Sequence, residues 1–360
     1  MRILIVTHAP LSAEFGAGQM AINLAEAFKK QGHDLVLWSP YPLPSQTKWW
    51  QRIKLMRTKL NCFMENQSPF DLIDCPAILI TKYLSKSSVI VARSVQPDLL
   101  YLFYNLKFSF QGNYYSIFKS LADDLYKVYK ILLIIQGWHR ANCILCLGTL
   151  EFRWMDRWFP WWKNKLFYYF NALSKNDSLR LSQIRQQRKP FTNNSLKFLW
   201  IGRWANHKGT ENLIKFIENW FAKYQKDTFT IAGCSEDISA YFSQELIQSG
   251  KLKIIPNFTR SQLDNILSEH NVGLFTSKVE GWGLVLNEML ESGMPVFATS
   301  AGGVEDLKPF ASSQLQSFPP LSLSVFNTLK DSMDIDGYYA TFTWEKITES
   351  YAKYILTQAI

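Results

Sequence analysis

Two pairs of charged side chains follow short apolar runs at spacings that suit a phosphorylated ligand. Glu280 and Glu288 lie eight residues apart, around the glycine turn 281–283. Arg203 and Lys208 lie five residues apart and precede another helical pattern. Fixed cations and a helix N-terminus that face one point offset the charge of a diphosphate. The two cations, and the glycine turn that the two acids bracket, are therefore candidates for a phosphate-binding site.

A strand-to-helix turn is expected to position each pair. The apolar run 272–275 predicts a buried strand, and 284–291 has helical periodicity with a glycine and a proline just beyond its end. The basic pair lies between the apolar run 196–201 and the helical pattern 209–222. In an open parallel sheet, ligands bind beyond the carboxyl ends of the strands. We therefore expect both turns to lie on neighbouring strands, at one edge of a sheet.

The alternation of strands and helices runs through the whole chain and predicts an α/β fold with two doubly wound, Rossmann-like sheets. At 360 residues the chain exceeds the roughly 250–300 residues at which single cores stop growing. The predicted strands are 3–7, 35–38, 72–73, 89–92, 143–147, 196–201, 228–232, 252–255, 272–275 and 295–299. The polar stretch 173–195, which contains a proline, predicts a linker between domains at 1–172 and 196–342. Two such domains would leave a cleft between them.

The positive charge of the chain belongs to its first half. The formal net charge is +9, and residues 1–175 contain 21 Lys and Arg but only 11 Asp and Glu. Such a half favours an anionic partner such as a membrane, a phosphorylated lipid or nucleic acid, although a solvated basic face has the same composition. Tryptophans interleave with these cations at 49–59 and 153–165, as at a bilayer interface or a site that stacks single-stranded nucleic acid. Packing in the core is the alternative for many of these rings.

Cysteine usage and hydropathy favour a cytoplasmic protein whose membrane contact is at most peripheral. The five cysteines are typical of reduced core residues, and Cys143 and Cys146 lie in a predicted buried strand, which disfavours a metal or redox role. No cleavable signal is expected at the N-terminus. The longest local apolar run, 131–135, is far shorter than a membrane span.

A dinucleotide fingerprint is formally present but lacks its usual surroundings. The segment 16–21 has glycines at 16 and 18 and an alanine in third place. However, eight residues separate it from the end of the first strand, and Trp38 and Ser39 replace the acidic residue that would bind a ribose. An oxidoreductase is therefore disfavoured. His8, His139 and His207 are candidates for catalysis or for structural roles, and no grouping with metal-ligand spacing is found.

These residues together resemble the retaining, nucleotide-sugar-dependent glycosyltransferases of family 4, which have the GT-B architecture. The resemblance is specific in the second half, where it rests on Gly202, Arg203, Lys208, Gly209, Ala232, Gly233, residues 280–284, Glu288, residues 292–296 and residues 302–304. It implies that the segment 343–360 is a C-terminal helix that crosses back to the first domain.

The resemblance also implies a role for each matching residue. Arg203 and Lys208 would bind the donor diphosphate, Glu280 the donor sugar, and Glu288 the nucleotide ribose. The other donor-binding residues would be Gly16, Gly18, Gly202, Gly281, Trp282, Gly283 and Leu284. The implied partners are a nucleotide diphosphate sugar as co-substrate and a glycan or lipid-linked acceptor, with no cofactor or catalytic metal and no nucleic acid.

The first half departs from this family at two places. Many relatives have a histidine after the strand 89–92, whereas this chain has Arg93, Ser94, Val95 and Gln96. The usual turn of small residues before the linker is replaced by Phe170 to Leu173. A degenerate relative that binds a sugar nucleotide or an anionic polymer without turnover therefore remains the alternative.

Overall fold

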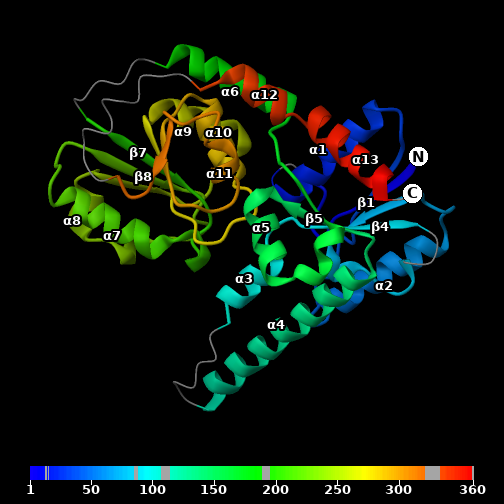
Figure 1. Ribbon diagram of the computed structural model, residues 1–360. Helices are drawn as coiled ribbons and strands as arrows, with labels where there is room; N and C mark the ends of the chain where they lie inside the picture. Colours follow the sequence, from blue (N-terminus) through cyan, green and yellow to red (C-terminus); the bar gives the residue numbers. More distant parts are fainter. Residues whose placement is uncertain are drawn as a thin grey trace. The chain divides into compact units, whose positions relative to one another are not determined.

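The chain divides into two compact units, each built around a six-stranded sheet (Figure 1). The computed structural model describes residues 1–12, 14, 16–84, 88–106, 114–188, 195–320 and 333–358, except for the side chains of 114–119 and 356–358. Unit 1 comprises Met1–Asn171 and Trp344–Ile360, and unit 2 comprises Ala172–Thr343. The predicted α/β fold of two parallel sheets is therefore confirmed.

Unit 1 contains a fully parallel sheet with the strand order β2-β1-β3-β4-β5-β6. Its strands are β1 (Arg2–Val6), β2 (Asp34–Trp38), β3 (Leu72–Cys75), β4 (Val89–Arg93), β5 (Cys143–Leu147) and β6 (Leu166–Tyr169). Its helices are α1 (Gly16–Lys30), α2 (Arg52–Glu65), α3 (Asp98–Tyr104), α4 (Tyr114–Arg140), α5 (Gly148–Trp158) and α13 (Trp344–Gln358).

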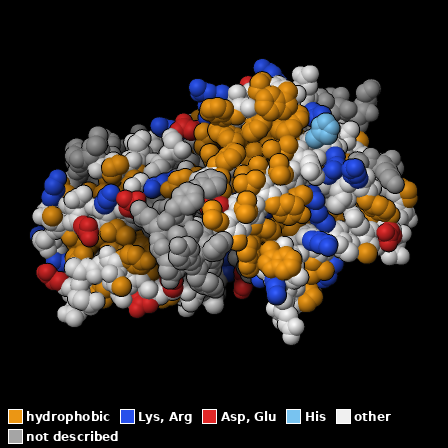
Figure 2. Space-filling model, turned by 90° about the horizontal axis from the view of Figure 1, so that it is seen from below, with side chains coloured by type: hydrophobic (Ala, Val, Ile, Leu, Met, Phe, Trp, Pro, Cys, Tyr) orange, Lys and Arg blue, Asp and Glu red, His pale blue; other side chains and the backbone are white. Residues whose placement is uncertain are grey.

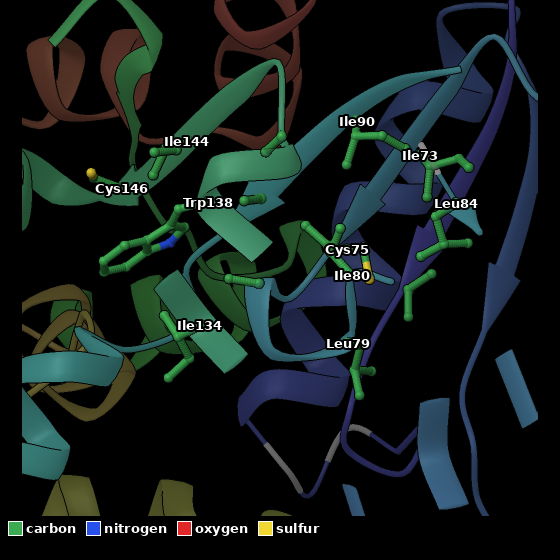
Figure 3. Packing of buried hydrophobic residues seen from close by; sticks show 14 of the residues in the cluster. Ile73, Cys75, Leu79, Ile80, Leu84, Ile90, Ile134, Trp138, Ile144 and Cys146 are labelled. Atoms are coloured by element: carbon green, nitrogen blue, oxygen red, sulfur yellow. The ribbon is translucent and has the colours of Figure 1, made fainter. Parts of the chain in front are cut away.

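One core of unit 1 lies between the sheet and α4. Because the central strands of a parallel sheet are covered on both faces, a strand such as β5 is apolar along its whole length and fully buried. Figure 3 shows the side chains that meet here, from Ile73, Cys75, Leu79, Ile80, Leu84, Ile90, Ile134, Trp138, Ile144 and Cys146. This packing fixes β4, which ends at Arg93 and is followed by Ser94, and β5, which α5 follows directly.

The C-terminal helix α13 belongs to unit 1. The ring of Tyr351 packs edge-on against Phe28 of α1, with centroids 5.3 Å apart, and its hydroxyl donates to the buried carboxylate of Asp74 on β3. The ring of Tyr354 stacks on Phe167 of β6 at 3.9 Å. These contacts tie the end of the chain to the first sheet.

Unit 2 contains a second parallel sheet with the strand order β12-β11-β10-β7-β8-β9. Its strands are β7 (Lys197–Ile201), β8 (Thr228–Ala232), β9 (Leu252–Ile255), β10 (Val272–Phe275), β11 (Val296–Ala298) and β12 (Leu315–Ser317). Its helices are α6 (Lys175–Gln187), α7 (Thr210–Phe221), α8 (Gln244–Gln248), α9 (Leu263–Glu269), α10 (Leu284–Glu291), α11 (Val304–Leu307) and α12 (Ile335–Thr341). In Figure 1, α7 lies on one side of this sheet and α9 and α10 on the other.

Two segments differ from the sequence-based prediction. Helix α1 begins at Gly16, so both glycines of the expected loop lie in its first turn. The stretch 173–195 contains α6 instead of irregular chain, because the hydroxyl of Ser174 caps that helix by accepting from the Asp177 N–H at 3.1 Å. Residues 189–194 of this stretch lie outside the described residues. Within the described part of the chain, no helix has the length and hydropathy needed to cross a bilayer.

Candidate functional site

The candidate site lies where the strand order of the unit 2 sheet reverses. The chain winds from β7 to β8 and β9 in one direction, then returns to β10 on the other side of β7. At such a switch point the loops after the two central strands diverge and leave room for a ligand at the carboxyl edge. The turn β7–α7 carries Arg203 and Lys208, and the turn β10–α10 carries Glu280. The expectation that these turns follow neighbouring strands is confirmed by the pairing of β7 with β10.

Hydrogen bonds fasten the two turns to each other. The Thr276 hydroxyl donates to the carbonyl of Lys208 at 2.8 Å, and the Lys278 N–H donates to the carbonyl of His207 at 2.8 Å. Gly209 makes this close approach possible, because a Cβ atom there would lie 1.8 Å from the Thr276 carbonyl oxygen. Its φ of +70° is also a left-handed conformation that favours glycine. The two turns therefore form one rigid surface.

An ion pair joins the two turns at their centre. The Lys208 ammonium donates to the Glu280 carboxylate, which also accepts from the Ser277 hydroxyl at 3.1 Å. The two side chains are 19% and 16% exposed, so both charged groups reach solvent without being fully hydrated. The structure thus brings together the predicted diphosphate-binding and sugar-binding side chains.

Arg203 contributes a second positive charge near this pair. Burial lowers the pKa of His207, the Lys208 and Arg203 charges lower it further, and Glu280 opposes them. These charges therefore act on one imidazole, which is neutral at pH 7. Arg203 is exposed and forms no ion pair with any other described residue, so its guanidinium is available to a ligand.

Glu288 lies deeper than Glu280 and is held by a basic side chain that the sequence did not single out. Its carboxylate is buried in α10 and accepts from Arg260, which also contacts Asp177 at 3.3 Å. Burial raises the pKa of Glu288, and the Arg260 guanidinium opposes that rise. Arg260 lies after β9, so its position beyond a predicted strand was the available signal. Asp177 lies in the stretch predicted to be a linker and gave no such signal.

The Trp282 side chain belongs to the core of unit 2. Its indole N–H donates to Asn287 at 2.7 Å, and the Asn287 amide donates to the Tyr338 hydroxyl at 2.7 Å. Its carbonyl accepts from the Gly303 N–H at 2.9 Å. The ring therefore positions the turn and is not exposed to a ligand. In this turn, the predicted contacts with the sugar nucleotide are therefore left to main-chain N–H groups, including that of Leu284, the first residue of α10.

Three of the predicted glycines have close neighbours that leave little room for a side chain. A Cβ atom at Gly18 would lie 2.3 Å from the Pro10 carbonyl, and one at Gly202 would lie 3.1 Å from the Trp200 ring. At Gly283, where φ is +89°, it would lie 2.7 Å from the Phe275 ring. Gly16 and Gly281 lie in the first turn of α1 and in the turn before α10, respectively. Their predicted contacts with a donor stay predictions.

Arg93, at the first of the two departures, is held inside unit 1. The Arg93 guanidinium is fully buried, pairs with Asp74 and donates to the Val6 carbonyl at 3.0 Å. Burial, and then the Arg93 charge, lower the pKa of His8 to about 4, so this imidazole is neutral at pH 7. Arg93 therefore stabilises the sheet and is not exposed to a ligand.

Among the described residues, neither the cysteines nor the potential metal ligands form a second candidate site. Cys62 is exposed, the other four cysteines are buried, and all five are free thiols. Burial raises the pKa of both Cys143 and Cys146. Within the described ranges, no cluster of three or more His, Cys, Asp or Glu side chains has the arrangement of a metal site.

Comparison with known proteins links this site to one family. Residues 182–308, roughly a third of the chain, match the family model "Glycosyl transferases group 1". This segment contains Arg203, Lys208, Arg260, Glu280 and Glu288. No curated protein sequence matches the chain.

Solved structures extend the likeness to both units. Sucrose-phosphate synthase from Thermosynechococcus elongatus aligns with a TM-score of 0.69 at 14% identity, over 99% of this chain and 98% of that one. The catalytic domain of starch synthase IV from Arabidopsis thaliana, bound to ADP and acarbose, aligns at 0.66 and 10% identity over 99% of each chain. Anabaena Alr3699/HepE in complex with UDP and glucose aligns at 0.64 and 16% identity, over 99% of this chain and 100% of that one. The chain therefore has the two-domain GT-B fold, and its residues 182–308 match the glycosyl transferases group 1 family.

Proposed function

We propose that the protein is a hexosyltransferase that moves a hexose from a nucleotide diphosphate sugar to a hydroxyl group of a glycan or a lipid-linked saccharide. The observation that carries this proposal is the Lys208–Glu280 pair, because it places a cation and a hydrogen-bond acceptor together at the switch point of the unit 2 sheet. The group 1 glycosyltransferase match over this segment supports it. The complexes of the neighbouring folds with UDP or ADP are consistent with a nucleotide donor.

Each charged side chain has a proposed task. Arg203 and Lys208 bind the donor diphosphate, and Glu280 accepts hydrogen bonds from the hydroxyls of the donor sugar. Arg260 contacts Oε1 of Glu288, which leaves Oε2 of that carboxylate for the hydroxyls of the nucleotide ribose. The first N–H groups of α10 add positive potential to the same edge.

The proposed reaction retains the configuration at the anomeric carbon. The acceptor oxygen bonds to that carbon on the face from which the diphosphate departs, and the bond from carbon to phosphate oxygen breaks. The departing phosphate oxygen takes the proton of the acceptor hydroxyl, so no separate general base is required. Because negative charge grows on the diphosphate as this bond breaks, Arg203 and Lys208 stabilise the transition state more than the ground state. These cations supply that charge stabilisation in a reaction that we propose to be metal-independent.

A binding experiment followed by a turnover experiment tests this function. Thermal unfolding is measured against a panel of nucleotides and sugar nucleotides, since a ligand at 100 times its dissociation constant stabilises a protein by about 2.7 kcal/mol. The donor that binds is then supplied with a radioactive sugar and an extract of glycans and lipid-linked saccharides. Transfer with an unchanged anomeric configuration, read by NMR of the product, supports the proposal. Inverted product refutes the mechanism, and absence of any nucleotide-dependent shift refutes the donor site.

A binding protein without turnover is the second candidate. The burial of Arg93 in an ion pair favours it, because no described cation or imidazole stands exposed where relatives have the histidine. Binding of a sugar nucleotide without transfer to any acceptor in the extract would select this candidate.

We also propose that unit 1 contacts an anionic membrane at its periphery, through an exposed apolar stripe on α4. Leu125, Val128, Tyr129 and Leu132 follow helical spacing and are all exposed, with Leu125 at 69% and Leu132 at 53%. The opposite side of α4 packs into the core through residues such as Ile134. A helix that is apolar on two sides needs a partner on the second one.

Tryptophans and cations extend this stripe. Trp49, whose ring packs on Tyr126 of α4 with centroids 4.7 Å apart, is half exposed, as is Trp50. Arg52 and Lys54 beside them are exposed. Figure 2 shows the molecule from below, which is the side where Figure 1 draws α4. Hydrophobic side chains gather in one area of this face, and Lys and Arg side chains lie around it. Indole rings and cations at one surface suit the headgroup region of an anionic bilayer.

Only some residues of the two tryptophan-rich segments, 49–59 and 153–165, are free to contact a membrane. In the cluster at 153–165, Trp162 is buried, whereas Trp158 and Trp161 are exposed. In the cluster at 49–59, two cations bind carbonyl groups of the fold. Arg57 donates to Ile78 at 2.8 Å, and Lys59 donates to Pro42 at 2.8 Å. The proposal therefore rests on α4 and the pair of tryptophans at 49–50.

Co-sedimentation with liposomes tests this surface. At low salt, we expect wild type to sediment with vesicles that contain phosphatidylglycerol, and Leu125→Ser with Leu132→Ser to remain in the supernatant. Leu179→Ser, at an exposed leucine of unit 2, serves as the control. Equal sedimentation of all three proteins, or none of wild type, would refute the surface.

A further inference from the structure

A hydrogen-bonded chain joins the loop after β4 to the first turn of α5. The Ser94 hydroxyl lies 2.8 Å from Oε1 of Glu151 and 2.6 Å from the Gln96 carbonyl oxygen. The other carboxyl oxygen, Oε2 of Glu151, accepts from the Leu147 N–H at 2.6 Å. Glu151 is only 8% exposed. The proposed reaction assigns no role to this buried acid.

The hydrogen bonds around Ser94 indicate the protonation state of Glu151, because they require a fixed number of protons. A hydroxyl group carries one proton, and a main-chain carbonyl only accepts. If Glu151 were ionised, Ser94 could donate to the carboxylate or to Gln96, and one close pair of oxygens would face each other without a proton. If Glu151 is protonated, Oε1 donates to Ser94 and Ser94 donates to Gln96, while Oε2 still accepts from Leu147. Only the neutral acid satisfies every group.

The surroundings of Glu151 favour the same state. Ser94, Asp98 and Glu151 line a small cavity of about 10 Å³, and its remaining walls are mostly apolar. Burial raises the pKa of Glu151 to about 8, and the nearby Asp98 adds to the rise, while the hydrogen bonds from Leu147 and Ser94 oppose it. An ionised carboxylate in this position would be poorly solvated.

No charged neighbour reverses this conclusion. Arg93 lines the same cavity, but its charge is paired with Asp74. Burial raises the pKa of Asp98 on α3 to about 6, against the attraction of Lys130 on α4. The titratable neighbours on β5 and β6, Cys146 and Tyr169, have pKa values raised by burial and are neutral at pH 7.

We propose that Glu151 is a positioning residue that acts as a neutral carboxylic acid, and that its proton holds the loop 94–98 at the carboxyl edge of the unit 1 sheet. This loop follows β4, and the Tyr169 hydroxyl holds it from β6 by donating to the Ser94 carbonyl at 2.6 Å. Ligands of parallel sheets bind at this edge, and we assign it to the acceptor because the proposed donor site lies in unit 2, so loss of the proton would disturb the surface that the acceptor contacts. The effect on turnover rests on the proposed transferase function, whereas the protonation state does not.

Glu151→Gln tests the protonation state without any substrate. The amide can donate to Ser94 and accept from Leu147, as the protonated acid does. The folded pKa of Glu151 is above its unfolded value, so its contribution to stability is present below about pH 4.5 and is lost as pH rises to about 8. We therefore expect the melting temperature of wild type to fall relative to Glu151→Gln across this window and to level off above it. Glu65→Gln, at an exposed residue of α2, should follow wild type.

Two outcomes overturn the proposal. Parallel stability profiles for wild type and Glu151→Gln would show that Glu151 is ionised, whether or not the protein transfers sugar. If Glu151→Gln does not fold, the infrared band of a protonated carboxyl in wild type, lost as pH rises through about 8, gives the same answer. For positioning, transfer by wild type should fall about tenfold per pH unit above that value and stay level in Glu151→Gln. Coincident transfer profiles would refute the positioning role alone.

Discussion

Neutralising both members of the central ion pair should separate folding from function. In unit 2, Lys208 and Glu280 neutralise each other at the switch point, with 19% and 16% of their side chains exposed. Lys208→Met leaves the carboxylate with only the Ser277 hydroxyl as partner, and Glu280→Gln leaves an ammonium facing an amide. The double variant contains neither charge. The three variants therefore form a double-mutant cycle around one contact.

The two readouts should respond differently. Leaving one charge partly buried and unpaired costs about 1.5–3 kcal/mol, so each single variant should lose about that much free energy of unfolding. The double variant leaves no charge unpaired and should return to within about 1 kcal/mol of wild type. Transfer should not return, because removal of a charged contact to the leaving group typically lowers kcat by about 100- to 1,000-fold.

Urea denaturation and initial transfer rates measure the two effects on the same preparations. Stability should recover in the double variant while turnover stays at or below that of the weaker single variant. A double variant that is both stable and active would show that the pair only fastens two turns together, and the proposed donor site would be wrong. A double variant as unstable as the singles would refute the reasoning about unpaired charge.

Three further predictions concern the same unit. Gly209→Ala should lower the free energy of unfolding, measured by urea denaturation, by about 3 kcal/mol or more, because the variant combines a left-handed φ with a Cβ atom 1.8 Å from the Thr276 carbonyl oxygen. Gly250→Ala is the control, since Gly250 has a similar φ of +71° but open space around it, and this variant should lose only about 1–2 kcal/mol. Equal costs would contradict the close approach of the two turns. Arg260→Met should lower the free energy of unfolding by about 2–3 kcal/mol, because it leaves the buried Glu288 carboxylate without its cation. The variant should also show a smaller thermal shift with the nucleotide. Unchanged stability and binding would show that Arg260 does not belong to the site. Chelation with EDTA should leave turnover unchanged, and a loss that added Mg²⁺ restores would contradict metal independence.

The central strands of both sheets were predictable from sequence because they are buried on both faces, whereas the edge strands β6 and β12 were missed. A run such as 272–275 is apolar without interruption, and the helix after it, 284–291, was placed with its observed bounds. Helix α4 was missed because apolar side chains occupy both its core face and its exposed stripe, so it lacks the one-sided pattern of an amphipathic helix. Helix α6 was missed for the opposite reason, since Leu181 is its only buried residue.

The chemical site was predictable in its members but not in its connections. Lys208 and Glu280 were found because each lies in a turn after an apolar run. Their contact depends on β7 lying beside β10, which is a property of the strand order and not of the local pattern. Arg260 was missed because its partner Glu288 is distant in sequence, and its own neighbours in the chain are polar loop residues.

The charges at the two sheet edges divide the proposed work between the units. At the carboxyl edge of unit 1, burial lowers the pKa of His8 to about 4 and raises that of Glu151, which we propose to be neutral, to about 8, and Arg93 is paired with Asp74. Burial raises the pKa of Asp98 to about 6, between these two values. The corresponding edge of unit 2 offers an exposed guanidinium and a partly exposed ion pair instead. A leaving diphosphate needs fixed positive charge, which the edge of unit 2 supplies, and we propose that the acceptor hydroxyl binds at the edge of unit 1. Deprotonation of Glu151 should therefore impair use of the acceptor before it affects binding of the donor.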